Sequence, residues 1–217
     1  MRDPAHAAPI DTVRVRVPRA VREREMRDVA AALFAERGYH GTSMDEIAVR
    51  SGVSKPMVYE YFGSKEGIYL ACVAEAEKGL IESMERAVSA ETAPDRQLWA
   101  GATAFFTFVE EQREGWSVLF EEAPSKDGAF AEAAKRIRRR QAQVIGRLMS
   151  ASAEAAGAQI KPDEIDAIAH ALVGAGEAMA MWWREHPETE RDVVVLRLVN
   201  FALLGVGSLL AGERWTP

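Results

Sequence analysis

The chain has 217 residues and a mass of 23.9 kDa, which is room for one ordinary domain and a small module. Hydrophobic residues make up 48% of it, enough for a packed core and too many for a disordered chain. The net charge of −6 argues against a protein that coats nucleic acid indiscriminately. Residues 1–65 carry 11 Lys or Arg against 9 Asp or Glu, whereas residues 66–217 carry 16 against 24. A polyanion is therefore expected to dock on the N-terminal part.

Residue counts also limit the chemistry. A single cysteine, Cys72, allows neither a disulfide framework nor a multi-cysteine metal site, and no two of the four histidines have metal-ligand spacing. No nucleophile-elbow or phosphate-loop motif is present, so we expect no enzyme, no catalytic residue, no metal and no cofactor. The first residues lack the apolar stretch of a secretory signal, which predicts a cytoplasmic protein. The apolar run 193–211 is interrupted by Arg197 and Asn200 and is interpreted as a buried helix and not a membrane span.

Residues 1–20 contain three prolines and no helical periodicity, so we expect a flexible arm. Arginines cluster at its end and just beyond, at Arg14, Arg16, Arg19, Arg22 and Arg24. Such a basic arm either follows phosphates or enters a minor groove, or it remains a solvated tail.

Three short helices are expected in residues 21–68. The first has apolar residues at helical spacing, namely Met26, Val29, Ala30, Leu33 and Phe34, and ends at Gly38. Ser43 and Glu46 form the pattern of a capping box that opens the second, which stops at Gly52. The third begins near Ser54 and ends near Phe62.

The rest of the chain, residues 69–217, also reads as helical. A long helix is expected from Ser64 to about Ala90. Further helices are expected at residues 95–114, 116–122, 128–156, 162–185 and 190–211, separated by Gly115, Pro124, Gly157 and Pro187. With no strand-like alternation of useful length beyond residues 13–17, the predicted fold class is all-α: an N-terminal three-helix helix-turn-helix module followed by a helical ligand-binding and dimerisation domain.

The segments GTSMDEIA (residues 41–48) and SGVSKPMVYEYFGSKE (residues 51–66) resemble the DNA-binding region of the TetR family of transcriptional regulators. The resemblance covers about residues 22–70. The three-helix arrangement itself predicts that the third helix enters the major groove, with Val53 and Val58 packed inward and Lys55, Met57 and Tyr59 facing out. Several family members have glycine or threonine in place of Pro56 or Met57, so the preferred DNA sequence is not transferable.

The resemblance also assigns roles to individual residues. Tyr59, Lys65 and Thr42 are expected on phosphates, and Lys55, Pro56 and Met57 are expected to face base edges. Ordinary packing is the alternative for the aromatic side chains. The expected DNA-binding set is Thr42, Ser43, Ser54, Lys55, Pro56, Met57, Tyr59, Tyr61 and Lys65.

The last two expected helices are rich in small and apolar residues, among them Gly174, Gly176, Gly205 and Gly207. In the family such a pair forms a four-helix interface with its symmetry mate, which implies a homodimer and a palindromic operator. The alternative is that both helices only fill their own core.

The middle of the chain gathers aromatic and methionine side chains that suit an apolar small molecule, although a fully packed core predicts the same residues. His170 and Glu177 are seven residues apart and are expected on one helix face. Three roles are open for the pair: they anchor a ligand's polar group, they form hydrogen bonds across the dimer interface, or they face solvent. The basic run 135–140 is interpreted as a solvated face, with an acidic or phosphate-bearing effector as the alternative. The expected pocket set is Trp99, Phe105, Phe106, Trp116, Phe120, Met149, His170, Glu177 and Met181.

These features predict a dimeric repressor that binds double-stranded operator DNA. A small-molecule effector is expected to release the repressor from the DNA by tilting the long helix that begins at Ser64. Three alternatives stay open. The first is an enzyme or ligand-binding protein whose N-terminus only resembles a DNA reader. The second is an effector-independent nucleoid-type protein, and the third is an activator.

Overall fold

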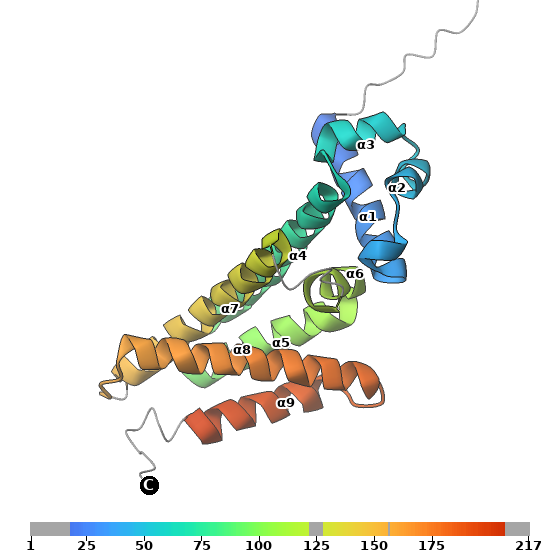
Figure 1. Ribbon diagram of the computed structural model, residues 1–217. Coiled ribbons are helices and arrows are strands. Elements are labelled where there is room, and N and C mark those ends of the chain that lie inside the picture. The colour runs from blue at the N-terminus through green and yellow to red at the C-terminus, as the bar shows by residue number, and fades with distance from the viewer. Residues whose placement is uncertain (1–17, 122–127, 156, 207–217) are drawn as a thin grey trace, which may run out of the picture.

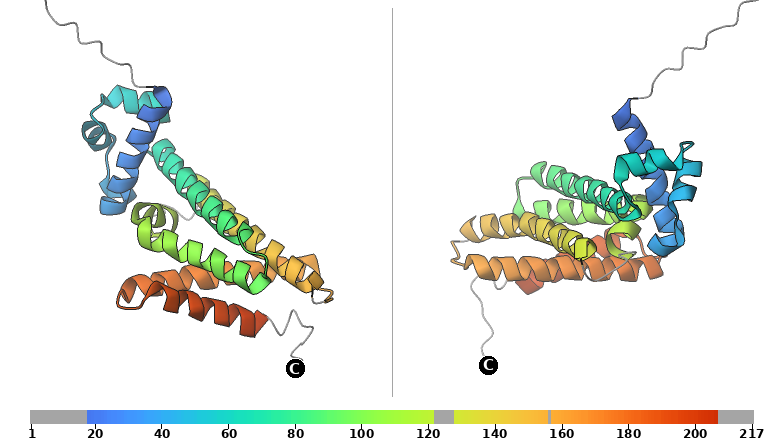
Figure 2. Two further views of the ribbon diagram at one scale, coloured as in Figure 1. Left: turned by 180° about the vertical axis from the view of Figure 1, so that it is seen from behind. Right: turned by 45° about the horizontal axis from the view of Figure 1, so that its top comes forward.

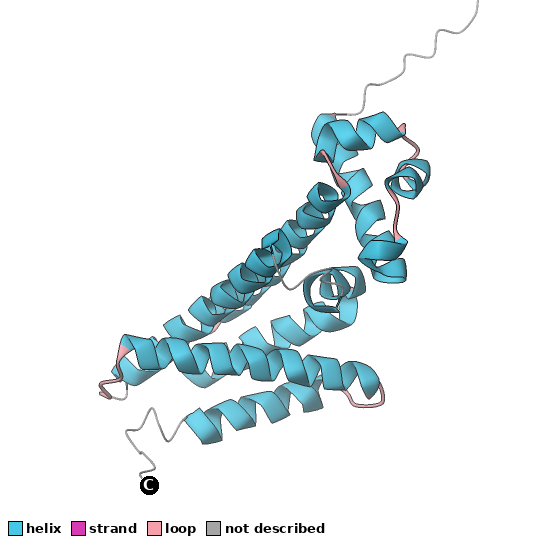
Figure 3. Ribbon diagram, viewed as in Figure 1, coloured by secondary structure: helices cyan, strands magenta, loops and turns pink. Residues whose placement is uncertain are grey.

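In the computed structural model, which describes residues 18–121, 128–155 and 157–206, every regular element is a helix (Figure 3). The helices of the N-terminal module are α1 (Arg19–Gly41), α2 (Met44–Arg50) and α3 (Lys55–Phe62). The body contains α4 (Lys65–Ser89), α5 (Pro94–Glu111), α6 (Arg113–Trp116), α7 (Gly128–Ala155), α8 (Pro162–Glu185) and α9 (Arg191–Phe201). Two π-helical turns, η1 (Ser117–Glu121) and η2 (Ala202–Val206), follow α6 and α9. The all-α prediction is confirmed.

The three-helix module lies at one end of the molecule, and α8 with α9 lies at the opposite end (Figures 1 and 2). Helix α4 joins the two ends: its start follows α3, and its length packs along α5 and α7. At 25 residues, α4 is about 37 Å long. One continuous helix therefore connects the N-terminal module to the α5 and α7 helices of the body.

Some boundaries differ from those expected from the sequence. Helix α1 begins at Arg19, so the end of the expected arm is already helical, while residues 1–17 lie outside the described part. Gly38 has φ 70°, a conformation that L side chains avoid, and it breaks the regular helix where the sequence predicted an end. The last helix ends at Phe201 and continues as η2, and the expected residues 207–211 lie outside the description.

The expected capping box is only half formed. Ser43 Oγ accepts a hydrogen bond from the backbone N–H of Glu46, at 3.1 Å. The Glu46 carboxylate, however, pairs with the guanidinium of Arg37 on α1. A charged partner outcompetes a neutral backbone N–H for the same carboxylate, so the sequence pattern was right about the cap and wrong about its second bond.

Two packed regions form the core. The larger runs from the N-terminal module through α4, α5 and η1, and its fully buried side chains include Phe34, Ile68, Phe106 and Trp116. The smaller one lies among α7, α8 and the start of η2. Across α4 and α7, the buried carboxylate of Glu77 receives hydrogen bonds from the guanidinium groups of Arg136 and Arg140 at 3.0–3.1 Å. This pairing fixes the middle of α4 against α7.

Among the described residues, no helix is long and apolar enough to cross a membrane. The expected apolar helix near the C-terminus has one buried face and one exposed face in the structure, and apolar side chains lie on both. On α9, Val194 and Val195 are buried, whereas Leu196 and Phe201 are exposed. The predicted burial holds for the face of α9 that packs on the body, and the other face is exposed in the single chain.

Candidate DNA-binding surface and ligand pocket

The turn between α2 and α3 holds the third helix in place. Gly52 has φ 65°, and the N–H of Val53 reaches back to the carbonyl of Ala48 at 3.0 Å, which closes the turn. Val58 is fully buried under α3, and Val53 packs against the same core. The inward positions expected from the sequence are confirmed, and the opposite side of α3 is left at the surface.

That outer side carries most of the expected DNA-contacting residues. Ser54, Lys55 and Pro56 at the start of α3 are exposed, and Tyr59 one turn later is 43% exposed. Met57 is half-buried, with its sulfur 3.8 Å from a guanidinium nitrogen of Arg22. The first two turns of α3 therefore present a short mixed polar and apolar surface, which is the kind of surface that reads base edges.

Lys55 is held in the absence of DNA by an acidic neighbour. Its ammonium donates to Asp45 Oδ2 on α2 at 2.8 Å, and this hydrogen bond raises the pKa of Lys55 above the usual lysine value. The side chain stays charged over the whole physiological range. The ammonium has three N–H donors, so Lys55 can contact guanine while it keeps Asp45 or after it exchanges Asp45 for the base.

Lys65 stands at the start of α4 with its ammonium 4.5 Å from the centre of the Tyr39 ring. Partial burial lowers the pKa of Lys65 below the usual lysine value, and the ring face stabilises the charged form. Next to it, Ser64 Oγ accepts the N–H of Gly67 at 3.0 Å and caps the helix. Tyr61 is half-buried under the guanidinium of Arg19, 4.4 Å from its ring centre.

Thr42 does not fit the expected phosphate contact. Its side chain is 2% exposed, and its hydroxyl lies 2.9 Å from the carbonyl of Gly38 and 3.1 Å from that of Leu33. The hydroxyl therefore donates its proton to a backbone carbonyl of α1, at the point where α1 turns into α2. Ser43 next to it is exposed, with its oxygen engaged in the α2 cap.

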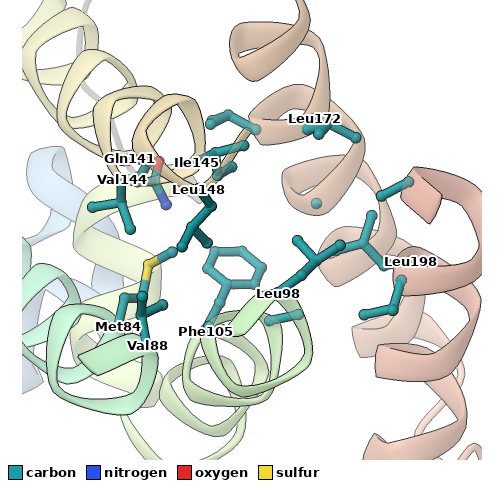
Figure 4. A pocket seen from close by; sticks show the side chains of 16 residues that line it. Met84, Val88, Leu98, Phe105, Gln141, Val144, Ile145, Leu148, Leu172 and Leu198 are labelled. Carbon is teal, nitrogen blue, oxygen red and sulfur yellow. The ribbon is translucent and has the colours of Figure 1, made fainter. Parts of the chain in front are cut away.

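An apolar cavity lies inside the body, between five helices (Figure 4). Its volume is about 60 Å³, and its walls come from Met84 and Val88 of α4 together with side chains of α5, α7, α8, α9 and the start of η2. A second, outer hollow of about 330 Å³ adjoins it and shares five lining residues with it, Leu98, Ile145, Leu148, Leu172 and Ala202. The two hollows are therefore neighbours within the body.

Only two of the expected pocket residues reach these hollows. Phe105 lines the inner cavity, and Met149 lines the outer one. Four other aromatic residues belong to the core instead: Phe106 and Trp116 are fully buried in it, Trp99 packs against it, and Phe120 stacks on Trp116 at 4.2 Å. The aromatic residues of the sequence were correctly predicted to be buried. Their residue type did not predict which of them line the cavity.

The expected polar pair of α8 does not line the cavity. His170 is exposed and bonds through Nδ1 with the carbonyl of Asp166, four residues earlier. Glu177 is half-buried against Arg138 of α7 at 3.0 Å, and burial raises its pKa despite the opposing guanidinium. Met181 is 55% exposed. Helical spacing placed these side chains on one face, but it does not tell which neighbour that face meets.

The sequence reasoning missed one polar residue of the cavity, Gln141 on α7. It is 2% exposed, and it lines the inner cavity. The signal was present: Gln141 interrupts the apolar stripe of Ile137, Val144 and Leu148, at the spacing of a single helix face. A lone amide in such a stripe indicates either a buried hydrogen bond or a polar contact to a ligand.

A module that presents an outward helix, joined by one long helix to a body with an apolar cavity, is the architecture of a ligand-responsive transcriptional regulator. The family description "Bacterial regulatory proteins, tetR family" matches residues 27–72. The description "Tetracyclin repressor-like, C-terminal domain" matches residues 94–205, just over half of the chain. The chain therefore belongs to the TetR family of DNA-binding regulators.

Solved structures of the family show the same fold. A TetR-like transcriptional regulator from Rhodococcus sp. RHA1 is 34% identical, covers 88% of this chain and 99% of its own, and superposes with a TM-score of 0.72. FadR of Bacillus subtilis, solved in complex with stearoyl-CoA, has a TM-score of 0.69 at 15% identity over 88% of this chain and 99% of its own. At that identity the likeness concerns the fold alone.

Curated relatives match over a shorter stretch. The HTH-type transcriptional activator FasR of Mycolicibacterium smegmatis is 39% identical over 106 residues, which are 49% of this chain and 48% of that protein. The HTH-type transcriptional regulator HbdR of Aromatoleum sp. is 28% identical over 110 residues, 50% of this chain and 48% of its own length. The chain thus spans about half the length of these curated relatives.

Proposed function

We propose that the protein is a homodimeric repressor that binds a palindromic operator through α3 and leaves it when a largely apolar small molecule fills the cavity. The observation that carries the proposal is the course of α4. This helix lines the cavity with Met84 and Val88 and starts at Lys65, directly after α3. The same helix therefore lines the proposed ligand site and begins at the lysine for which we propose a phosphate contact.

The dimer is proposed from the apolar surface at the far end of the molecule. Large apolar side chains remain exposed on α8, α9 and η2 of the single chain: Met181, Trp182, Val193, Leu196, Phe201, Leu203 and Leu204. Large exposed apolar side chains gathered on neighbouring helices mark a protein interface. A twofold pairing of these helices, as in the family, places two copies of α3 on the same side of the DNA, which suits half-sites about 10 bp apart.

The size of the cavity supports a coupling between ligand and DNA. An inner volume of about 60 Å³ holds a few water molecules, whereas small-molecule sites occupy about 300–1,000 Å³. A ligand must therefore move the walls apart. Because one wall is α4, and because Glu77 ties α4 to α7, the displacement reaches Lys65 and the recognition helix. A coupling of about 1–3 kcal/mol corresponds to about 5–150-fold weaker DNA binding.

The ligand class rests on the cavity walls, which are apolar apart from Gln141. The complex of B. subtilis FadR with stearoyl-CoA supports a ligand with a long apolar part, because that protein shares the fold. One relative favours activation over repression, because FasR of M. smegmatis is named as a transcriptional activator.

The proposal is tested by selecting binding sites from a random double-stranded library with the full-length protein. We expect enrichment of one palindrome with half-sites about 10 bp apart. Tyr59→Phe removes one hydroxyl per protomer and should weaken binding to the enriched site by at least about 10-fold, because hydrogen bonds to charged groups are strong. The matched control, Lys78→Met on the far side of α4, should bind as the native protein does.

Each outcome has a definite meaning. A library that remains unenriched while the protein retains DNA favours the nucleoid-type alternative, and a protein that binds no DNA leaves the proposal without support. A reporter gene behind the selected site gives the direction: deleting the regulator raises expression for a repressor and lowers it for an activator.

A further inference from the structure

The ammonium of Lys65 is held by an aromatic ring and not by a carboxylate. It lies 4.5 Å from the centre of the Tyr39 ring, and among the described residues no carboxylate forms an ion pair with it. Lys55 on α3 differs in this respect, because its ammonium is paired with Asp45 at 2.8 Å. The two lysines proposed to contact DNA are therefore held in place in two different ways.

A ring and a carboxylate leave a lysine in different electrostatic states. A carboxylate neutralises the ammonium and competes with a phosphate for it. An aromatic ring attracts a cation through its quadrupole and carries no net charge. Lys65 on the Tyr39 ring is thus restrained while its full charge remains available, and it is this charge that attracts a phosphate.

The Tyr39 ring is itself fixed by three other aromatic side chains. Phe34 of α1 lies nearly parallel to it, with the ring centres 5.9 Å apart. Tyr69 of α4 and Phe130 of α7 contact it edge-on, with ring centres at 5.2 and 5.5 Å. Because these contacts hold the ring, the ring restricts the lysine side chain and not the reverse.

This restriction affects the affinity for DNA through conformational entropy. A long, flexible side chain loses rotamer freedom when it is immobilised at an interface, which weakens binding by about 2- to 12-fold for one such side chain. Where the ring already restricts Lys65 in the free protein, that loss has occurred on folding and not on binding. A twofold dimer contains the contact twice, so the effect on its affinity is about 4- to 140-fold.

We propose that Tyr39 is a positioning residue for operator binding, whose ring holds the Lys65 ammonium at the place where an operator phosphate meets it. The inference rests on the proposed function, because it takes Lys65 as a phosphate contact. In this role Tyr39 acts through Lys65 and needs no DNA contact of its own. Removal of the ring should therefore weaken operator binding only while the lysine is present.

The test is a double-mutant cycle on the full-length protein, with affinities measured by fluorescence anisotropy on the site obtained by selection. The four proteins are native, Tyr39→Leu, Lys65→Met and the variant that carries both substitutions. Leucine keeps an apolar side chain among the aromatic neighbours but removes the ring face. Tyr39→Phe is the matched control, because it keeps the ring. Tyr39→Met replaces Tyr39→Leu in the cycle should the leucine variant fold poorly by circular dichroism.

We expect Tyr39→Leu to bind the site at least about 4-fold more weakly than the native protein, and Tyr39→Phe to bind within about twofold of it. In the Lys65→Met background, Tyr39→Leu should change the affinity by less than about twofold, because no ammonium remains to be positioned. An equal weakening in both backgrounds would show that the ring only stabilises the module, and would overturn the positioning role. Native affinity in Tyr39→Leu would overturn it too.

Failure of this inference is distinguishable from failure of the proposed function. A native protein that selects no site refutes operator binding, and the role of Tyr39 falls with it. A native protein that binds the selected site and loses affinity in Lys65→Met, but not in Tyr39→Leu, keeps the proposed function and refutes the role of Tyr39 alone.

Discussion

Gly67, in the first turn of α4, is the residue whose replacement most directly probes the junction between the recognition helix and the long helix. A Cβ atom built on Gly67 would lie 2.0 Å from the carbonyl oxygen of Phe62, the last residue of α3. Contacts under 3.0 Å are essentially never seen for real Cβ atoms. In Gly67→Ala the end of α3 must therefore move away from α4 by roughly 1 Å, the difference between these distances.

The cost follows from two opposing terms. Overpacking of this kind costs about 1–3 kcal/mol, and the obstructing atom is backbone, which cannot rotate aside. Replacing a helical glycine with alanine contributes about 0.5–1 kcal/mol of stability in the other direction. We expect a net loss of about 1–2 kcal/mol for Gly67→Ala.

Gly79 provides the matched control, because it lies in the same helix and a Cβ there would meet nothing within 4 Å. Gly79→Ala should gain the full helix term of about 0.5–1 kcal/mol. Urea unfolding followed by circular dichroism measures both. A Gly67→Ala protein that is as stable as the native protein, or that gains as much as Gly79→Ala, would refute the close junction.

Three further predictions concern other parts of the chain. Burial raises the pKa of the Cys72 thiol to about 12, so native protein at pH 8 should resist iodoacetamide until urea unfolds it; complete labelling within minutes in buffer would contradict this. Burial also raises the pKa of Glu177, so its contribution to stability is present below the ordinary Glu pKa and is lost as the pH rises through the folded value. In urea titrations, the free energy of unfolding of Glu177→Gln should therefore rise relative to that of the native protein as the pH is raised from acidic to neutral. A relative rise as the pH is lowered would contradict this. Phe201→Glu should give monomers in sedimentation experiments, whereas Val49→Glu, equally polar but on α2, should leave the dimer intact; dimeric Phe201→Glu would count against the α8–α9 interface.

Most of the helical architecture was predictable because its signals are local. The periodic apolar residues of α1, the Ser43 cap and the turn at Gly52 each depend on a few neighbouring residues, and the structure confirms them. Thr42 shows the limit: its sequence position indicated a surface role, while its burial depends on where α1 turns at Gly38. The bond from Glu46 to Arg37 likewise depends on how α1 and α2 meet.

The ligand pocket was poorly predictable because a cavity is a property of packing between distant segments. Phe105 and Phe106 are adjacent aromatics of α5, yet only Phe105 lines the cavity, since the two side chains leave the helix about 100° apart. Glu177 was singled out as a polar residue in an apolar helix, and the same argument applied to α7 would have selected Gln141. Helix periodicity identifies such residues but does not reveal which of them meets an arginine and which meets a cavity.

The central claim, that α3 and the start of α4 hold operator DNA, is tested most directly by fluorescence anisotropy on the selected site across a salt series. Native protein should bind the site far more tightly than scrambled DNA. Lys65→Met should weaken binding and reduce the salt slope by about 2, one phosphate contact from each protomer of the dimer, whereas Lys78→Met should change neither. Equal affinity for both DNAs, or a Lys65→Met protein with native affinity and slope, would contradict the account.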